Sequence, residues 1–519
     1  MDTTSLWQAT STTPDGDPFP VGAAVEVVVV GAGITGVATA HALRARGLEV
    51  MVLEARDLGG VTTARTTGKV SLLQGRTLSR IRRAAGAEAV TDYLAVQRVG
   101  QQWWRDVVGV GADLQVRDAL TYAVTSAGRD RLLREWQASV EAGLPVEAVG
   151  AEAIEVDLPL PTSQEVVAIR LRDQLQTHPT RALAKVLAQL RADGVTVVSG
   201  VRVTGVKVGE PTVVRTDHGD VRAQHVVLAT GTPILDRGMQ FARLTPERSY
   251  AISYRLPDGS PPPQGMYLST DDATRSIRSV PLARGEDAGE GSADGAGGES
   301  AGELVVVGGN GHVVGREQDA AAKVDGLHAW SQRVFTGAER LHTWSAQDYR
   351  SDDSLPIVGP LVGDDPRILS ATGFGKWGLT NGAAAGIALA GWVTGEVPPW
   401  AQALGQHRWR PGRVATLAQI NATVAAHLAG DWARGLAVPL PDAPPAEGEG
   451  VVGRRGVVPV ACSTVDGSSR AVSAICTHLG AVLSWNSAER TWDCPLHGSR
   501  FDADGSLLEG PATRPLDPA

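Results

Sequence analysis

Residues 25–55 read "VEVVVVGAGITGVATAHALRARGLEVMVLEA", and this stretch decides the fold of the larger part of the 519-residue chain. A continuous valine run is typical of a strand that is buried on both faces, as in a parallel sheet. The run leads into a glycine-rich turn, then into a segment of helical periodicity that stops near Gly47. A second apolar run ends at Glu54. This order predicts a Rossmann-like dinucleotide-binding unit in an α/β fold.

The glycines of the turn have distinct physical roles. Gly31 permits the tight turn, Gly33 lets the backbone approach a pyrophosphate, and Gly36 allows close packing of helix on strand. The free N–H groups and the dipole of the following helix then favour a phosphate. Glu54 stands at the distance where a carboxylate accepts hydrogen bonds from a ribose 2′-OH, which disfavours NADP.

The segments that follow favour FAD. Residues 54–71, "EARDLGGVTTARTTGKVS", supply a loop rich in Gly and Thr. This loop, "HVVLATGTP" at 225–233 and "SATGFGKWGLTNGAAAGIALA" at 370–390 resemble, in order, FAD-dependent amine and amino-acid oxidoreductases of the D-amino-acid oxidase and glycine oxidase type. The resemblance implies FAD contacts at Gly31, Gly33, Ile34, Thr35, Gly36, Glu54, Ala55, Arg56, Thr62, Thr63, Thr66, Gly68, Lys69, Val203, Thr230, Gly231, Gly373, Gly375, Gly378 and Thr380.

We expect the FAD to be bound noncovalently. The loop at 59–75 holds no histidine, and no cysteine precedes Cys462, so the usual covalent anchors of related flavoproteins are missing. A second glycine-rich run, "LVVVGGNGHVVG" at 304–315, has the wrong glycine spacing and no long helical pattern directly after it. We interpret it as a hairpin, not as a site for NAD(P)H.

A second informative stretch lies near the C-terminus, where residues 476–502 read "CTHLGAVLSWNSAERTWDCPLHGSRFD". The pattern is Cys-x-His, fifteen further residues, then Cys-x-x-His. Two thiolates and two imidazoles suit a tetrahedral zinc ion or a two-iron cluster with mixed ligands. A Cys2His2 zinc finger usually keeps its Cys pair and its His pair together. Here each loop supplies one residue of each kind.

The flanking residues "CTHLG" and "CPLHGS" resemble the cluster loops of Rieske [2Fe-2S] proteins. The resemblance implies that Cys476 and Cys494 bind one iron while His478 and His497 bind the other. A structural zinc site is the alternative. The third cysteine, Cys462, lies in a strand-like apolar run and is predicted to be a buried strand residue.

Comparison with the respiratory Rieske proteins also suggests a potential for the cluster. Their disulfide-forming cysteines are replaced here by Ala481 and Leu496, and a tyrosine that donates to a cysteine ligand is replaced by Phe501. Ser499 keeps a hydroxyl that the family uses for a cluster sulfur. Hydrogen bonds to sulfur stabilise the reduced cluster. We therefore expect a potential in the lower or middle part of the Rieske range of roughly -150 to +300 mV.

The resemblances and the composition shifts predict three domains. The expected parts are a discontinuous FAD-binding domain at 22–80, 170–240 and 340–395, an α+β substrate domain with a mixed sheet at 81–169 and 241–339, a helical connector with a Pro-rich linker at 396–447, and a small all-β Rieske domain at 448–519. The acidic, glycine-rich run at 283–303 is predicted to be a disordered loop.

The substrate side is less clear from sequence. Oxidation of an amine at a flavin needs a held neutral amine and often a cation for a carboxylate. Candidate catalytic residues are Arg275, Arg278, Tyr250 and Lys376, with Arg248 and Tyr254 as further polar residues.

These observations predict an FAD-dependent dehydrogenase that oxidises a small amine or amino-acid-like substrate. Its electrons would pass singly through a Rieske cluster to an external acceptor, which is a ferredoxin-like protein, or alternatively a quinone or cytochrome. Two other functions stay open: a redox sensor or electron-transfer module without an organic substrate, and a Rieske oxygenase component.

The composition narrows the location and the partners. A formal net charge of -9 and a pI near 5.7 argue against a nucleic-acid-binding surface. No apolar run is long enough to span a bilayer, and the first residues lack the features of a signal peptide. We therefore expect a cytoplasmic location.

Overall fold

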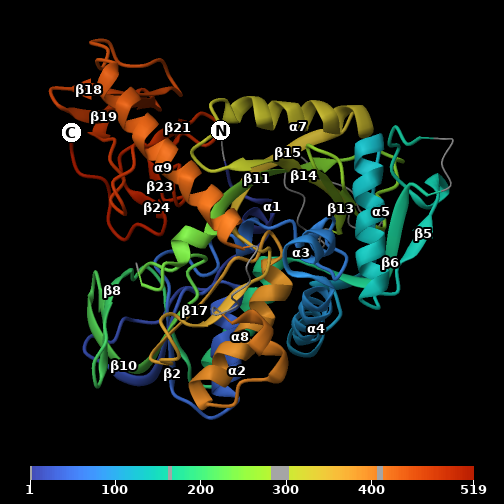
Figure 1. Cartoon of the computed structure of the whole chain (residues 1–519), viewed down its shortest axis with the longest axis horizontal. Coiled ribbons are helices and arrows are strands. Elements are labelled where there is room, and N and C mark those ends of the chain that lie inside the picture. The colour runs from blue at the N-terminus through green and yellow to red at the C-terminus, as the bar shows by residue number, and fades with distance from the viewer. Residues whose placement is uncertain (1–2, 162–165, 236, 282–302, 406–412) are drawn as a thin grey trace, which may run out of the picture.

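The computed structural model describes residues 3–161, 166–235, 237–281, 303–405 and 413–519. Figure 1 shows two large sheet-and-helix regions and a smaller third region that carries the C-terminus. The acidic run predicted as a disordered loop lies, apart from residue 303, outside the described residues.

The first sheet contains the dinucleotide-binding unit and has eight strands in the order β16-β17-β10-β1-β2-β7, with β8 and β9 attached through β10. The pairs around β1 are parallel, as predicted for a buried valine run. Helices α2 (Ile34–Arg44), α6 (Pro179–Ala192) and α8 (Gly378–Thr394) accompany this sheet. Its strands are β1 (Ala24–Val30), β2 (Val50–Leu53), β7 (Thr196–Val198), β8 (Val203–Lys207), β9 (Thr212–Thr216), β10 (Gly219–Leu228), β16 (Ile357–Pro360) and β17 (Ile368–Thr372).

The second sheet has nine strands in the order β15-β11-β14-β13-β12-β4-β6-β3, with β5 paired to β6. It is mixed, since β12 and β4 are parallel and the other pairs are antiparallel. Its strands are β3 (Lys69–Val70), β4 (Leu114–Tyr122), β5 (Glu147–Val149), β6 (Ala168–Thr177), β11 (Leu244–Arg255), β12 (Met266–Ser269), β13 (Arg275–Pro281), β14 (Glu303–Val313) and β15 (Glu339–Ser351). The helices beside it are α3 (Thr77–Ala85), α4 (Ala87–Trp103), α5 (Ser126–Glu141) and α7 (Ala320–Val334).

The boundary between the two sheet regions differs from the predicted ranges. Strands β3, β6 and β15 fall within segments expected for the FAD-binding domain, yet they belong to the second sheet. The chain crosses from one sheet to the other near these three strands. Each strand therefore lies at least partly inside a range that was predicted for the other sheet. The run at 304–315 lies mostly in β14 and pairs with β11 and β13 on both sides. A helix, α7, does begin shortly after it, but the antiparallel pairing excludes a dinucleotide turn.

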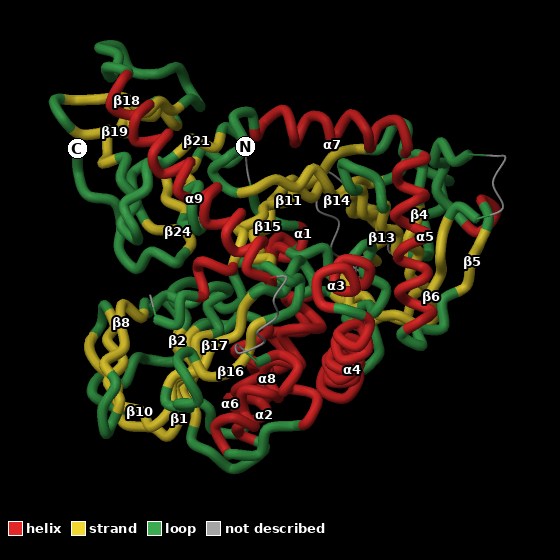
Figure 2. Tube along the Cα trace, in the orientation of Figure 1, coloured by secondary structure: helices red, strands yellow, loops and turns green. Residues whose placement is uncertain are grey.

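The third region is small and all-β. It contains a three-stranded sheet of β18 (Gly450–Arg455), β19 (Val458–Val465) and β20 (Ser468–Ser473), and a four-stranded sheet of β21 (Ser484–Asn486), β22 (Thr491–Asp493), β23 (Arg500–Asp502) and β24 (Leu507–Glu509). The long helix α9 (Arg413–Ala437) joins it to the rest of the chain (Figures 1 and 2). Cys462 is half-buried in β19, not buried as predicted, because its neighbours Ala461 and Ser463 take the inward-facing positions.

Candidate active site and cluster site

The turn between β1 and α2 accepts only glycine at two positions. Gly31 has a φ of +105°, and a Cβ there would lie 2.5 Å from the carbonyl oxygen of Ala229. A Cβ on Gly36 would lie 1.8 Å from the carbonyl oxygen of Gly31. The backbone therefore turns tightly and the helix approaches the strand as closely as a pyrophosphate-binding turn requires.

Polar groups hold this turn in place. Glu54 is buried, and its carboxylate accepts from the backbone N–H of Ala32 at 2.9 Å and of Arg56 at 3.1 Å. The hydroxyl of Thr63 accepts from the N–H of Ile34 at 3.1 Å. The N-cap residue Gly33 has no side chain, and apart from the Ile34 N–H, which donates to Thr63, the N-terminal end of α2 can face an anionic ligand.

A cavity of about 790 Å³ opens at this turn and runs between the two large sheets. Its volume lies in the upper part of the range of small-molecule sites, which suits a dinucleotide together with a small substrate. The predicted FAD-contact residues that line it are Gly31, Gly33, Ile34, Thr35, Glu54, Ala55, Arg56, Thr62, Thr63, Thr66, Lys69, Val203, Thr230, Gly231, Gly375 and Gly378. Four others, Gly36, Gly68, Gly373 and Thr380, are not part of the lining.

Two of the four candidate catalytic residues line the same cavity. The phenol of Tyr250 lies 3.2 Å from Nε2 of His312, and both residues are in the lining. The ammonium of Lys376 lies 3.5 Å from a carboxylate oxygen of Glu247. Burial raises the pKa of Tyr250, so its phenol stays protonated at neutral pH. These two side chains are placed where an organic substrate could touch them.

The two candidate arginines lie outside the lining. Arg278 is buried, donates to the carbonyl oxygens of Gly68 at 2.8 Å and Thr177 at 3.1 Å, and stacks on Trp7. Arg275 donates to Oδ1 of Asn310 at 2.7 Å and stacks on Trp330. Both guanidinium groups are therefore engaged in the protein's own structure. Tyr254 is likewise hydrogen-bonded to Nδ1 of His328, at 3.0 Å.

Sequence reasoning missed several charged residues that line the cavity. Lys69, predicted as a cofactor contact, is buried and donates to Ser276 of β13. Burial, and secondarily the charge of Arg278, lowers the pKa of Lys69 to about 7. Burial likewise raises the pKa of Asp348 to about 6. Besides Asp348, the acidic, basic and histidine lining residues that were missed are Arg65, Arg76, Arg80, Arg202, Glu247, Asp272, His312, Lys323, Arg350 and Glu509. The basic, amphipathic pattern "GRTLSRIRRA" at 75–84 was the only sequence signal for some of them.

The four predicted cluster ligands converge in the all-β region. Cys476 and Cys494 are both buried, and their side chains lie next to each other. The ring centroids of His478 and His497 are 5.2 Å apart, and the two ring planes are nearly perpendicular. Among the described residues, no group of three or more His, Cys, Asp or Glu is arranged to hold a single metal ion. The proximity of the two cysteines to each other, and of the two histidines to each other, fits a two-iron cluster that holds its Cys pair and its His pair on separate irons.

Side chains around the cysteines agree with the comparison made from sequence. The Ser499 hydroxyl is hydrogen-bonded to Cys476 and accepts from the N–H of Ala512 at 3.0 Å. Phe501 is completely buried in β23 and has no group that can donate to sulfur.

Replacing Phe501 with Tyr should raise the cluster potential. One added hydrogen bond to sulfur contributes about 0.5–1.5 kcal/mol, which for a one-electron centre corresponds to about 20–60 mV. A redox titration followed by EPR measures it. A wild-type potential near the top of the Rieske range, or no shift in the variant, would contradict this explanation.

The all-β region forms part of the cavity wall. Glu509, Gly510, Ala512 and Thr513 line the cavity together with residues of the dinucleotide turn. The ring of His497 packs edge-on against Phe241, at 5.2 Å between centroids, and only 7% of His497 is exposed. His478 by contrast is half-buried. His497 is therefore packed against the part of the chain that carries the two large sheets, whereas His478 is more exposed.

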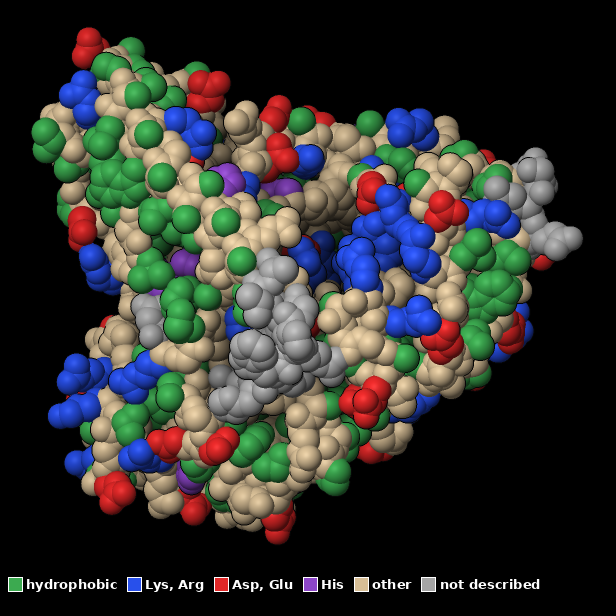
Figure 3. Space-filling model, viewed as in Figure 1, with side chains coloured by type: hydrophobic (Ala, Val, Ile, Leu, Met, Phe, Trp, Pro, Cys, Tyr) green, Lys and Arg blue, Asp and Glu red, His purple; other side chains and the backbone are tan. Residues whose placement is uncertain are grey.

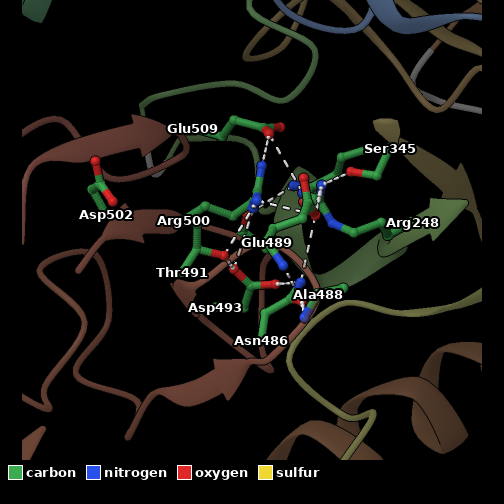
Figure 4. Close-up of polar contacts among 12 residues, drawn as sticks. Arg248, Ser345, Asn486, Ala488, Glu489, Thr491, Asp493, Arg500, Asp502 and Glu509 are labelled. Carbon is green, nitrogen blue, oxygen red and sulfur yellow. Dashed lines mark hydrogen bonds and ion pairs between the residues drawn. The ribbon is translucent and has the colours of Figure 1, made fainter. Parts of the chain in front are cut away.

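A network of buried ion pairs joins the all-β region to the second sheet (Figure 4). Arg248 of β11 lies 2.7 Å from Glu489 and 3.4 Å from Glu509. Arg500 lies 3.1 Å from Glu489, 2.6 Å from Glu509 and 3.2 Å from Asp493. Burial would raise the pKa of Glu489, but Arg248 and Arg500 outweigh it and lower the pKa to about 2. Arg248, considered from sequence as a polar residue of the substrate side, is thus part of a domain contact.

Comparison with protein-family models places this geometry in a family. The model described as FAD dependent oxidoreductase matches residues 26–392. The chain belongs to this family. A second model, the Rieske [2Fe-2S] domain, matches residues 444–518. The cofactors of this FAD-dependent oxidoreductase are accordingly FAD and one [2Fe-2S] cluster, as predicted.

Similar proteins match either the whole chain or one part of it. The Rieske 2Fe-2S iron-sulfur protein YhfW of Bacillus subtilis is 28% identical over 522 residues, covering 99% of this chain and 96% of that protein. A 45-residue stretch is 51% identical to cytochrome b6-f complex iron-sulfur subunit 1 of Nostoc sp., covering 9% of this chain and 25% of that one. Glycine oxidase from Geobacillus kaustophilus matches in structure with a TM-score of 0.56 and 16% identity, over 75% of this chain and 100% of that chain. L-amino acid deaminase from Proteus vulgaris matches in structure with a TM-score of 0.57 and 15% identity, over 77% of this chain and 100% of that chain.

The helices of the described residues include none that is both long and apolar enough to cross a membrane.

The FAD should leave the protein on acid precipitation. No histidine or cysteine is among the residues that line the cavity near the dinucleotide turn, and His312 lies on β14 of the other sheet. The yellow colour is therefore expected in the supernatant. A flavin that stays with the pellet would contradict noncovalent binding.

Proposed function

We propose that the chain is a cytoplasmic dehydrogenase that oxidises a small amine or amino-acid-like substrate and delivers the electrons singly, through its Rieske domain, to an external acceptor. A ferredoxin-like protein is the preferred acceptor. When bound, FAD takes two electrons from an organic substrate and a Rieske cluster carries one at a time.

The observation that carries the proposal is that Gln347 contacts both the flavin cavity and the Rieske domain. Gln347 lines the cavity and donates from Nε2 to the carbonyl oxygen of Gly498 at 2.7 Å, one residue after the ligand His497. Its Oε1 accepts from Arg248 at 2.7 Å, and its backbone oxygen accepts from Thr62 at 2.7 Å. Gln347 is thus held from the flavin loop and from the Rieske domain at once. Electron transfer inside the chain needs this kind of short, rigid connection.

The cavity also favours an enzyme over a sensor or electron-transfer module. Beyond the predicted cofactor contacts, it is lined by Tyr250, Glu247, His312 and Lys376, which can orient a substrate and exchange protons with it. A module without an organic substrate has no need of such a lining. The oxygenase alternative requires a mononuclear iron site in addition to the two cofactors that the family models imply.

An anaerobic screen of amines and amino acids tests the proposal. A substrate should bleach the flavin first, and the EPR signal of the reduced cluster should follow. Two outcomes would contradict it: no compound bleaches the flavin, or a compound that bleaches it leaves the cluster oxidised.

A further inference from the structure

The loop that carries the second pair of cluster ligands packs against the oxidoreductase part of the chain. A Cβ on Gly315, between β14 and α7, would lie 2.6 Å from the backbone nitrogen of Pro495. In the same segment, Nε of Arg316 donates to the carbonyl oxygen of Pro495 at 3.0 Å. Pro495 directly follows the ligand Cys494. The oxidoreductase part therefore supplies a cationic side chain that is bonded to the cluster loop of the Rieske domain.

The charge of Arg316 is not neutralised by an ion pair. Within the described part of the chain, the bond to Pro495 is the only hydrogen bond or ion pair of its half-buried side chain. Asp431 of α9 is the carboxylate that acts on it most strongly, but Asp431 is itself paired with Arg434. Figure 3 shows basic and His side chains together at the surface of this junction, beside α9.

The guanidinium of Arg316 also lies within electrostatic reach of a cluster ligand. Burial lowers the pKa of Arg316, and the charges of Asp431 and then of Cys494 act in the opposite direction. Attraction between two charges is mutual, so Arg316 stabilises negative charge at the Cys494 side of the cluster site. The net charge around an iron-sulfur cluster is one of the properties that set its reduction potential.

We propose that Arg316 raises the reduction potential of the cluster and thereby favours electron transfer from the reduced flavin to the Rieske domain. The step transfers one electron and forms or breaks no bond, so the reduced cluster carries one more negative charge. The electron comes from the flavin, which the organic substrate has reduced with two, and an external acceptor removes it. A fixed cation beside the cluster stabilises the reduced state, more strongly at a half-buried site than in open water.

This effect is opposite in direction to that of Phe501, which lacks the hydroxyl that would also stabilise the reduced cluster. The two residues belong to different parts of the chain, since Phe501 lies in β23 of the Rieske domain and Arg316 lies before α7. The potential of the cluster is therefore determined by both parts and not by the Rieske domain alone. This inference goes beyond the proposed substrate oxidation, because it concerns the cluster and its surroundings only.

The test is a redox titration at pH 7 of the full-length protein loaded with FAD and cluster, followed by EPR. Arg316→Met removes the charge and should lower the ratio of reduced to oxidised cluster at a fixed potential roughly 3- to 30-fold. For a one-electron centre this corresponds to a fall in potential of about 30–90 mV. Arg316→Lys keeps the charge and should keep most of the wild-type potential. Iron content and the g values of the reduced cluster report whether each variant holds an intact site.

Arg333→Met is the matched control, because it changes the net charge of the chain by the same amount. Arg333 is exposed near the C-terminal end of α7, about 20 Å from the start of the helix at about 1.5 Å per residue. This variant should keep the wild-type potential. An unchanged potential in Arg316→Met, or an equal fall in Arg333→Met, would overturn the proposal.

An Arg316→Lys variant whose potential falls as far as that of Arg316→Met would also overturn it, because the bond to Pro495 and not the charge would then be responsible. The titration uses chemical reductants and no substrate. Its failure would therefore leave the proposed substrate oxidation standing, and a failure to find a substrate would leave this result standing.

Discussion

Cys476→Ser is expected to abolish turnover with an artificial one-electron acceptor while substrate still bleaches the flavin. The thiolate, not the thiol, is the metal ligand, and a serine hydroxyl is a poor replacement. Cys476 is buried beside Cys494 in the cluster site, whereas the flavin cavity is lined by other residues. Loss of the cluster should therefore stop the reduction of the acceptor without stopping the reduction of the flavin. Stopped-flow spectroscopy measures flavin bleaching, and steady-state assays measure acceptor reduction.

Cys462→Ser is the matched control, because Cys462 is a half-buried cysteine in the same domain that is not among the predicted ligands. It should keep the EPR signal, the flavin bleaching and the acceptor turnover. If Cys476→Ser loses the cluster signal but keeps full acceptor turnover, the cluster is not on the electron route.

Arg248→Met should destabilise the contact between the Rieske domain and the rest of the chain. The Arg248 side chain is 1% exposed, and its removal leaves Glu489 and Glu509 with one arginine instead of two. Breaking a buried ion pair by removing one partner costs about 3–5 kcal/mol. We expect a lower melting temperature and slower reduction of the cluster after the flavin has been reduced.

Arg255→Met is the comparison on the same strand. Arg255 pairs with Glu339 at 2.7 Å, but both side chains are largely exposed, at 39% and 60%. Removing an exposed pair costs about 0–1 kcal/mol. Equal behaviour of the two variants would mean that the network adds nothing to docking.

FAD and a [2Fe-2S] cluster could be predicted from the sequence because the signals for both cofactors are local. Gly31, Gly33 and Gly36 stand in one short motif directly after a valine run, so the turn can be identified from a few neighbouring residues. The ligands Cys476 and Cys494 stand in short motifs whose spacing sets the chemistry. Strand β1 could also be predicted locally, because its run of valines indicates a buried strand without knowledge of the strands that pair with it.

The substrate side could not be predicted because its arginines differ only in what surrounds them. Arg278 was a candidate catalytic residue, yet its guanidinium donates to the backbone oxygens of Gly68 and Thr177. Arg80, on a helix with several arginines, makes no such bond within the described part of the chain and was not singled out. Which guanidinium is satisfied depends on residues far along the chain: Arg248 and Glu509 are 261 positions apart. Such pairings between distant residues cannot be identified from a single sequence without the fold.

The wall that Glu509, Gly510, Ala512 and Thr513 contribute to the flavin cavity has a consequence for engineering and for evolution. The Rieske domain is not an exchangeable module, because a transplanted domain would have to reproduce both the cavity wall and the charges that meet Arg248. A chimera with a foreign Rieske domain should keep its iron but expose the flavin to solvent. Substitutions at this junction are expected to become fixed in pairs, one in each domain.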